Sequence, residues 1–449
     1  MENKFIKLAD LPPNPTDTEA LLHYKDMGFT VCLMTEDDVK LVERGTVSRA
    51  YENAIQNISD TGLQVWIRNM FNDPGYFDSE GVTAGSNYGC AYEMEPRHIT
   101  DEFSRFPGVT GFYMADEAYM YRLPERVNVE QIHPEAHKFA SFDQLCKLVD
   151  WKNQYYPQAF FHMNHVPSQS WDHYLPRDGK IYDYEDFLTE YVNVILKRLK
   201  GCGRSLCLDN YPFIGENYME KDYLFDLMTA AKVTRAYNAQ AKPEDQAVFG
   251  ICLQTFEAKG MCDDRRRDIT LPEEVTLQMY VGMALGARLL EFFAYRSYRN
   301  DFVGILAPDG SDRIYDIVKT ASRRAAFFEP VLSRYESIGA YMVPGARYSD
   351  NTAAIIMARD LFCKPYEIAV QGEYDVLVGC FTRGGEKAYM LVNYTDPLRG
   401  RTGTVTLTGC PAELKLYKDG KETVLQTEAG TVSITLQSGN CAFAVWQGE

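Results

Sequence analysis

The feature that most constrains the fold is an alternation, over the first 340 residues, of short β-type apolar runs with longer segments of helical periodicity. Alternation of this kind is typical of a parallel sheet with crossover helices. The runs predict eight strands, of which the first is weak: Phe5–Leu8, Thr30–Met34, Leu63–Asn69, Val109–Ala115, Ala159–Asn164, Ser205–Asp209, Ala247–Gln254 and Arg288–Tyr295. Helices are predicted between them, among others at Thr18–Met27, Ser48–Thr61, Phe142–Tyr155, Tyr184–Leu199, Tyr223–Ala239 and Pro272–Leu285.

Eight such units in about 340 residues have the size and rhythm of a (β/α)8 barrel with long loops. A doubly wound open sheet is the structural alternative, but no Gly-x-Gly-x-x-Gly follows an early strand. We therefore predict an α/β fold in which residues 1–340 form a catalytic TIM barrel.

The rhythm changes after about residue 340, where short alternating runs are separated by Gly, Asn and Asp. These runs are AAIIMA, YDVLVGCF, KAYMLVNY, GTVTLT, ELKLYKDGKETVL, GTVSITL and CAFAVWQ. They predict an antiparallel β-sandwich over residues 341–449, which we interpret as an accessory domain. Lys-Asp-Gly-Lys at 418–421 predicts a hairpin turn, because Asp-Gly accepts the positive φ values of two-residue turns.

Charge excludes several kinds of partner. Lys plus Arg number 46 against 63 Asp plus Glu, and the net charge of −17 repels phosphate backbones and anionic lipid. Nucleic acid is therefore not an expected partner. No run approaches the 18 or more apolar residues of a membrane span, so no membrane association is expected either.

The cysteines predict a reduced, cytoplasmic protein. The eleven Cys include no Cys-x-x-Cys pair, and Cys207, Cys252 and Cys380 sit inside apolar runs, which is typical of buried thiols. The first residues lack the apolar core of a signal peptide, although a leader trimmed from this sequence would change the expectation. We expect no cofactor and no metal. The oligomeric state stays open, and a homo-oligomer is compatible with the sequence.

Side chains of a barrel strand alternate between the lumen and the helix layer, so the bulky aliphatic residues set the phase of each strand. In LCLD, Leu206 and Leu208 face the helices, which directs Asp209 and Tyr211 inward. The same argument selects Trp66, Arg68, Glu117, His162, Asn164, Gln254, Glu291 and Tyr295. Nearly all lie toward the carboxyl ends of their strands, where barrel enzymes keep their active sites.

Acidic and aromatic residues, without a phosphate loop or a nucleophile elbow, favour a carbohydrate substrate. Hydrolysis of a glycosidic bond needs one carboxylic acid to protonate the leaving oxygen, and usually a second carboxylate as nucleophile or base. Aromatic faces stack on sugar rings, and 13% of the residues are aromatic.

Four motifs in order resemble a known family: FYMADEA at 112–118, FFHMNHVP at 160–167, SLCLDNYPF at 205–213 and GARLLEFFAY at 286–295. They resemble bacterial glycoside-hydrolase-like (β/α)8 proteins and, more distantly, clan A glycosidases such as the β-galactosidases that carry a β-sandwich after the barrel. The resemblance implies a glycoside hydrolase of O-glycosyl bonds. It also implies that Glu117 is the general acid/base.

Two departures from clan A leave the second carboxylate open. Asp116 stands where those enzymes have Asn before the acid, and Gln254 stands where their nucleophilic Glu ends strand seven. Asp209 is the first choice for the second carboxylate, because it faces inward at a strand end beside Tyr211. Glu291 is the second choice, and its alternative is a structural ion pair with Arg68. We expect the other inward residues, together with Asp116, to bind substrate.

Several alternatives remain. The adjacent Asp116 and Glu117 also resemble the pair of substrate-assisted N-acetylhexosaminidases, in which the acetamido group of the substrate attacks the anomeric carbon. A structural alternative for Asp116 is that its side chain caps the helix that follows. A catalytically silent carbohydrate-binding barrel is the alternative that Gln254 favours. A lyase or isomerase would need a lumenal Lys or a metal. His162 and His165 fit core histidines better than metal ligands beside Asp209, because no metal-binding spacing accompanies them.

Overall fold

The computed structural model describes residues 4–34, 42–43, 46–68, 108–115, 142–168, 183–215, 218–257, 266–297, 303–307 and 311–448. The chain divides into two compact units. The first, here the N-terminal unit, comprises Ile6–Asp209 and Val233–Cys252. The second, here the C-terminal unit, comprises Met1–Phe5, Asn210–Lys232 and Leu253–Glu449.

Eight strands form one sheet, in the order β1-β12-β11-β8-β7-β6-β5-β2, and make a nearly closed barrel. They are β1 (Ile6–Ala9), β2 (Val31–Met34), β5 (Gln64–Arg68), β6 (Val109–Ala115), β7 (Phe160–His165), β8 (Arg204–Asp209), β11 (Ala247–Gln254) and β12 (Leu289–Phe293). The registers from β2 through β5, β6, β7 and β8 to β11 are parallel. The predicted barrel is therefore confirmed.

Helices alternate with these strands. The longer ones are α1 (Thr18–Asp26), α2 (Arg49–Thr61), α4 (Phe142–Tyr155), α6 (Tyr184–Val194), α7 (Lys221–Asn238), α8 (Pro272–Ala284) and α9 (Arg313–Ala326). Side-chain oxygens of Asp17, Ser48 and Asp183 cap α1, α2 and α6 by accepting backbone N–H groups of the first turn. Helix α2 ends at Gly62, whose φ of 77° is the left-handed conformation that glycine adopts without steric cost.

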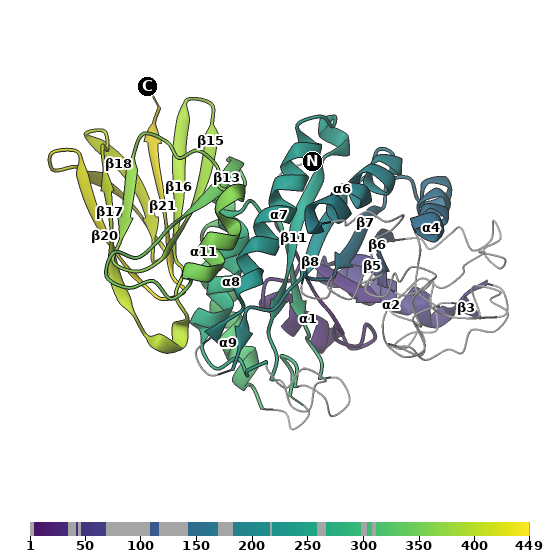
Figure 1. Cartoon of the computed structure of the whole chain (residues 1–449). Helices are drawn as coiled ribbons and strands as arrows, with labels where there is room; N and C mark the ends of the chain where they lie inside the picture. The colour runs from purple at the N-terminus through teal and green to yellow at the C-terminus, as the bar shows by residue number, and fades with distance from the viewer. Residues whose placement is uncertain are drawn as a thin grey trace, which may run out of the picture. The chain divides into compact units, whose positions relative to one another are not determined.

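The C-terminal β region consists of two antiparallel sheets, and Figure 1 labels β13, β15, β16, β18 and β21 of one sheet and β17 and β20 of the other. One has the order β13-β15-β16-β21-β18-β19, with bounds Glu336–Val343, Val376–Arg383, Glu386–Asn393, Cys441–Gln447, Glu413–Lys418 and Lys421–Gln426. The other has the order β14-β17-β20, with bounds Ala369–Gly372, Thr402–Thr408 and Thr431–Gln437. Buried residues of both sheets share one apolar core, so the predicted β-sandwich is confirmed.

The predicted hairpin at 418–421 is confirmed. Lys418 pairs with Lys421, and the two residues between them, Asp419 and Gly420, have φ values of 49° and 73°. Position 340, the predicted domain boundary, lies inside β13, the strand that pairs with β15 in the sandwich.

One predicted strand is wrong. The run AAIIMA at 353–358 belongs to helix α11 (Thr352–Ala358). Its buried residues are Ala354, Ile355 and Ala358, spaced for one helix face, whereas Ile356 is 56% exposed. Alanine also has the highest helix propensity, so the apolar content of this run did not indicate a strand.

No helix in the described segments combines the length and the apolar composition that crossing a membrane requires.

Candidate active site

In the N-terminal unit, three neighbouring strands place aromatic rings on one face. Trp66 of β5 stacks on Phe160 of β7 with ring centroids 4.8 Å apart, and its indole lies 5.7 Å from the His162 ring. Tyr113 of β6 lies 4.6 Å from the same imidazole. Gly111 leaves room for Trp66, because a Cβ there would lie 2.5 Å from the indole nitrogen. These contacts agree with the inward phase predicted for Trp66 and His162.

Polar groups extend this face toward the carboxyl ends of the strands. Arg68, the last residue of β5, forms an ion pair with Asp10, and its guanidinium lies 4.6 Å from the Tyr113 ring centroid. Asn164 donates a hydrogen bond to the Tyr113 hydroxyl at 2.8 Å. His162 Nδ1 and Ser205 Oγ share a hydrogen bond of 2.8 Å. The predicted residues Trp66, Arg68, His162 and Asn164 are thus brought together, with Tyr113 joining them.

The opposite phase faces the helix layer, as the pattern predicted. Phe112 packs edge-to-face against Trp151 of α4 and against Tyr156, one residue beyond that helix, with centroids 5.6 and 4.9 Å apart. His165 packs against Tyr191 of α6 at 4.1 Å. Burial, with a smaller contribution from His162, lowers the pKa of His165 to about 3, so this imidazole is neutral at pH 7. His165 is therefore a core histidine, on the opposite face of β7 from His162.

In the C-terminal unit, an aromatic cluster follows the carboxyl ends of three strands. Tyr211 lies two residues beyond β8, Phe256 lies two beyond β11, and Phe293 ends β12. Their ring centroids are 5.2 to 5.9 Å apart. Arg266 lies over the Tyr211 ring at 5.6 Å and donates to the Tyr211 carbonyl. Tyr211 and Phe293 are half-buried, so this cluster offers partly exposed ring surface where a barrel binds substrate.

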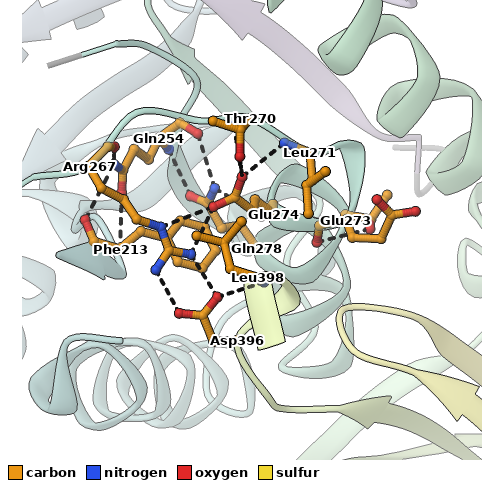
Figure 2. A network of polar contacts seen from close by, with 11 residues as sticks. Phe213, Gln254, Arg267, Thr270, Leu271, Glu273, Glu274, Gln278, Asp396 and Leu398 are labelled. Carbon is orange, nitrogen blue, oxygen red and sulfur yellow. Dashed lines mark hydrogen bonds and ion pairs between the residues drawn. The ribbon is translucent and has the colours of Figure 1, made fainter. Parts of the chain in front are cut away.

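Gln254, predicted to contact substrate, is buried and holds two backbone segments (Figure 2). Its Oε1 accepts the Phe213 N–H at 3.1 Å, while its Nε2 donates to the carbonyls of Phe213 at 3.4 Å and Arg267 at 2.9 Å. Gln278 of α8 accepts the backbone N–H of Gln254 at 2.7 Å. The amide of Gln254 therefore ties the segment after β8 to the segment after β11.

A buried ion network continues from that point (Figure 2). Arg267 donates two hydrogen bonds to Asp396, at 2.6 and 2.7 Å, and two to Glu274 Oε1, at 3.1 and 2.8 Å. The other oxygen of Glu274 accepts the N–H groups of Thr270 and Leu271 at 2.8 and 2.9 Å. This network ties the segment before α8, from Arg267 to Leu271, to Glu274 in the first turn of that helix.

The predicted carboxylates divide into three groups. Asp116 and Glu117 lie outside the described residues. Asp209 is half-buried as the last residue of β8. Glu291 is 1% exposed in the middle of β12. Tyr295, two residues beyond β12, is fully buried, and burial raises its pKa above the ordinary tyrosine value.

Four residues near these strands were not predicted from the sequence: Tyr113, Phe256, Phe293 and Glu257. Tyr113 lies between Phe112 and Met114, which were predicted to face the helices, so strand alternation alone could have found it. Glu257, three residues beyond β11, is buried and forms an ion pair with Arg313 at the start of α9. No periodicity marks Phe256 or Glu257, because both follow the strand rather than lie within it.

Solved structures of other proteins resemble this fold over nearly the whole chain. A catalytic mutant of a GH42 β-galactosidase from G. stearothermophilus matches with a TM-score of 0.53 and 9% identity, covering 99% of this chain and 98% of that one. A β-galactosidase from Bacillus circulans sp. alkalophilus matches with a TM-score of 0.51 and 8% identity, covering 99% of each chain. No family model and no curated protein matches the sequence. The resemblance to β-galactosidases is thus confirmed at the level of the fold.

Proposed function

We propose that this protein is a bacterial glycoside hydrolase that cleaves the O-glycosyl bond of an oligosaccharide or glycoside. The barrel, predicted as residues 1–340, would carry the active site, and residues 341–449 would be accessory. The observation that carries the proposal is the joined polar and aromatic face of Trp66, Arg68, Tyr113, His162 and Asn164. Buried polar groups so arranged are costly as packing alone and are typical of a substrate site. The whole-chain likeness to β-galactosidases supports the same class.

In the proposed mechanism Glu117 protonates the glycosidic oxygen as the bond to the anomeric carbon breaks. In the sequence, Glu117 comes two residues after the end of β6, the strand that contributes Tyr113. A second carboxylate either attacks the anomeric carbon or removes a proton from the attacking water. Asp209 is our first assignment, because it ends β8 and remains partly exposed; Glu291, deep in β12, is the second.

The remaining groups would hold the sugar. Asn164 and Tyr113 are joined by their hydrogen bond, and Arg68 is held by Asp10, so the geometry of these donors is set before substrate arrives. Tyr211 would stack on a sugar ring. Gln254 would act indirectly, because its amide is engaged with backbone groups. We also propose a cytoplasmic location, in keeping with the burial of Cys207 and Cys252 inside apolar barrel strands.

The test is a hydrolysis screen over aryl α- and β-glycosides, N-acetylhexosaminides included, with wild type and Glu117→Gln. The variant keeps the shape of the side chain but cannot donate the proton, so we expect kcat to fall at least about 100-fold. Glu244→Gln, on an exposed turn, is the matched control and should retain full activity. Hydrolysis by Glu117→Gln at the wild-type rate would overturn the assignment of the acid.

A substrate-assisted mechanism is the second candidate, because Gln254 places an amide where a clan A nucleophile would stand. It predicts turnover of N-acetylhexosaminides only, with Asp116→Asn and Glu117→Gln both impaired and Asp209→Asn near wild type. Loss of activity in Asp209→Asn on simple glycosides would instead support an enzyme carboxylate. If wild type hydrolyses no glycoside, the silent carbohydrate-binding barrel replaces both.

A further inference from the structure

A loop of the β-sandwich, residues 345–351 between β13 and α11, is held by one buried carboxylate. Asp375 is fully buried and accepts the Gly345 N–H on one oxygen at 3.0 Å. Its other oxygen accepts the N–H groups of Asp350 and Asn351, both at 3.0 Å, and the Asn351 side-chain amide at 3.2 Å. A carboxylate with this many donors fixes both ends of the loop.

The middle of the loop is fixed as well. Ala346 and Arg347 donate backbone hydrogen bonds to the carbonyls of Gly372 and Glu373, at 2.9 and 3.0 Å. A Cβ at Gly345 would lie 2.2 Å from the Tyr348 carbonyl oxygen, so only glycine permits this close approach. The loop is thus a rigid support for the residue at its centre, Tyr348.

The side chain of Tyr348 is exposed, although the backbone of its loop is held rigidly. It is 48% exposed, and every other aromatic side chain whose exposure the structure describes is buried or half-buried. The Arg401 guanidinium lies 4.3 Å from the Tyr348 ring centroid and 5.3 Å from that of Tyr374. Asp350 in turn forms ion pairs with Arg401 and with Arg399. A tyrosine ring is therefore presented to solvent on a support of fixed charges.

We propose that Tyr348 is the platform of a second carbohydrate-binding site, which takes a neutral polysaccharide chain. The C–H face of a pyranose stacks on an aromatic ring, and a ring already held in place loses little conformational freedom on binding. Arg399, which pairs with Asp350 two residues beyond Tyr348, supplies donors for sugar hydroxyls. Asp350 offsets part of the charge of Arg399 and Arg401, and the net charge of −17 disfavours an anionic glycan.

This inference rests on the proposed function for its ligand class, but its test does not depend on hydrolysis. Native gels that contain soluble β-galactan, mixed-linkage β-glucan or starch measure binding as retarded migration. Wild type should be retarded by at least one of these glycans. Tyr348→Ala should bind about tenfold more weakly, whereas Tyr348→Phe, which keeps the ring, should match wild type. Val424→Ala, which removes a 55% exposed apolar side chain from β19, is the control.

Each outcome decides one proposal. No retardation of wild type, equal retardation of Tyr348→Ala, or retardation only by polygalacturonate would overturn the neutral-glycan site. Aryl-glycoside hydrolysis, measured in parallel, should be the same in Tyr348→Ala and wild type. If wild type shows retardation that depends on Tyr348 but no hydrolysis, the proposed function fails while the binding site stands. A thermal melt of each variant within about 2 °C of wild type establishes that the loop change leaves the fold intact.

Discussion

At the scale of single residues, two histidines of β7 have opposite environments. His162 shares a hydrogen bond with Ser205 on the inner face, whereas His165 lies among Tyr191 and Phe187 of α6. The folded-state pKa of His165, about 3, lies below the ordinary histidine value of about 6.5. The unfolded chain therefore binds this proton first as the pH falls. The contribution of His165 to stability is full above about pH 6.5 and declines toward pH 3.

We therefore predict that His165→Phe, which keeps a ring but cannot titrate, flattens the pH dependence of stability. Between pH 7.5 and pH 5 the free energy of unfolding should fall by about 2 kcal/mol less in the variant than in wild type. Urea unfolding at the two pH values measures this difference. Leu22→Ala, which removes an exposed side chain of α1 and no titrating group, should leave the slope unchanged. Equal slopes for wild type and His165→Phe would contradict the buried, neutral state.

Strand alternation predicted on which face these residues lie but not what each side chain does. Trp66, His162 and Asn164 take the inward phase that the aliphatic residues indicated. Gln254 shows the limit, because its partners are backbone groups of Phe213 and Arg267, which lie outside any regular pattern. A loop conformation depends on contacts distant in sequence, so periodicity carries no information about it.

At the scale of elements, each predicted barrel strand begins and ends within two residues of the observed one. Strands of a parallel barrel are short, apolar and bounded by helices, and these features are all local. The run at 353–358 was misassigned because its apolar residues fit a helix face as well as a strand. Packing between elements was not predictable in this way, and α8 provides the clearest example.

Helix α8 approaches strand β15 so closely that only glycine fits between them. A Cβ at Gly379 would lie 2.2 Å from the carbonyl oxygen of Ala284, which is a backbone atom and cannot turn aside as a side chain could. We predict that Gly379→Ala lowers the free energy of unfolding by about 1–3 kcal/mol, because the helix must move away from the strand. Gly385→Ala, whose Cβ would meet only the end of the Gln447 side chain at 3.8 Å, should change it by less than about 0.5 kcal/mol. Chemical unfolding of the two variants makes the comparison; equal stabilities would contradict the close approach.

At the scale of the whole molecule, the C-terminal unit combines barrel elements with the entire sandwich. Arg267 and Asp396, which are 129 residues apart in the chain, form its central ion pair. Thr276 of α8 adds a hydrogen bond to the Gly439 carbonyl at 3.0 Å. The sequence shows where the pattern changes from barrel to sandwich, but it does not show these pairings. The position of a charged residue in the chain does not indicate which distant residue it will pair with in the fold.

We predict that Asp396→Ala lowers the free energy of unfolding by about 3–5 kcal/mol, because Arg267 stays buried after it loses that partner. Asp150→Ala, which breaks an exposed pair with Arg198, should cost no more than about 1 kcal/mol. Urea denaturation of both variants measures the difference. Similar losses in the two would show that the Arg267 network does not stabilise the unit.

The bonds of Gln254 also restrict which sequences can evolve from this one. Glutamine and glutamate codons differ by a single base, yet a glutamate at 254 would present oxygen to the carbonyls of Phe213 and Arg267, which now accept hydrogen bonds. Two chain segments would have to refold before that carboxylate was tolerated. In a lineage with this loop arrangement, one mutation cannot therefore move a catalytic carboxylate to this strand. A catalytic carboxylate would have to arise on another strand of the barrel.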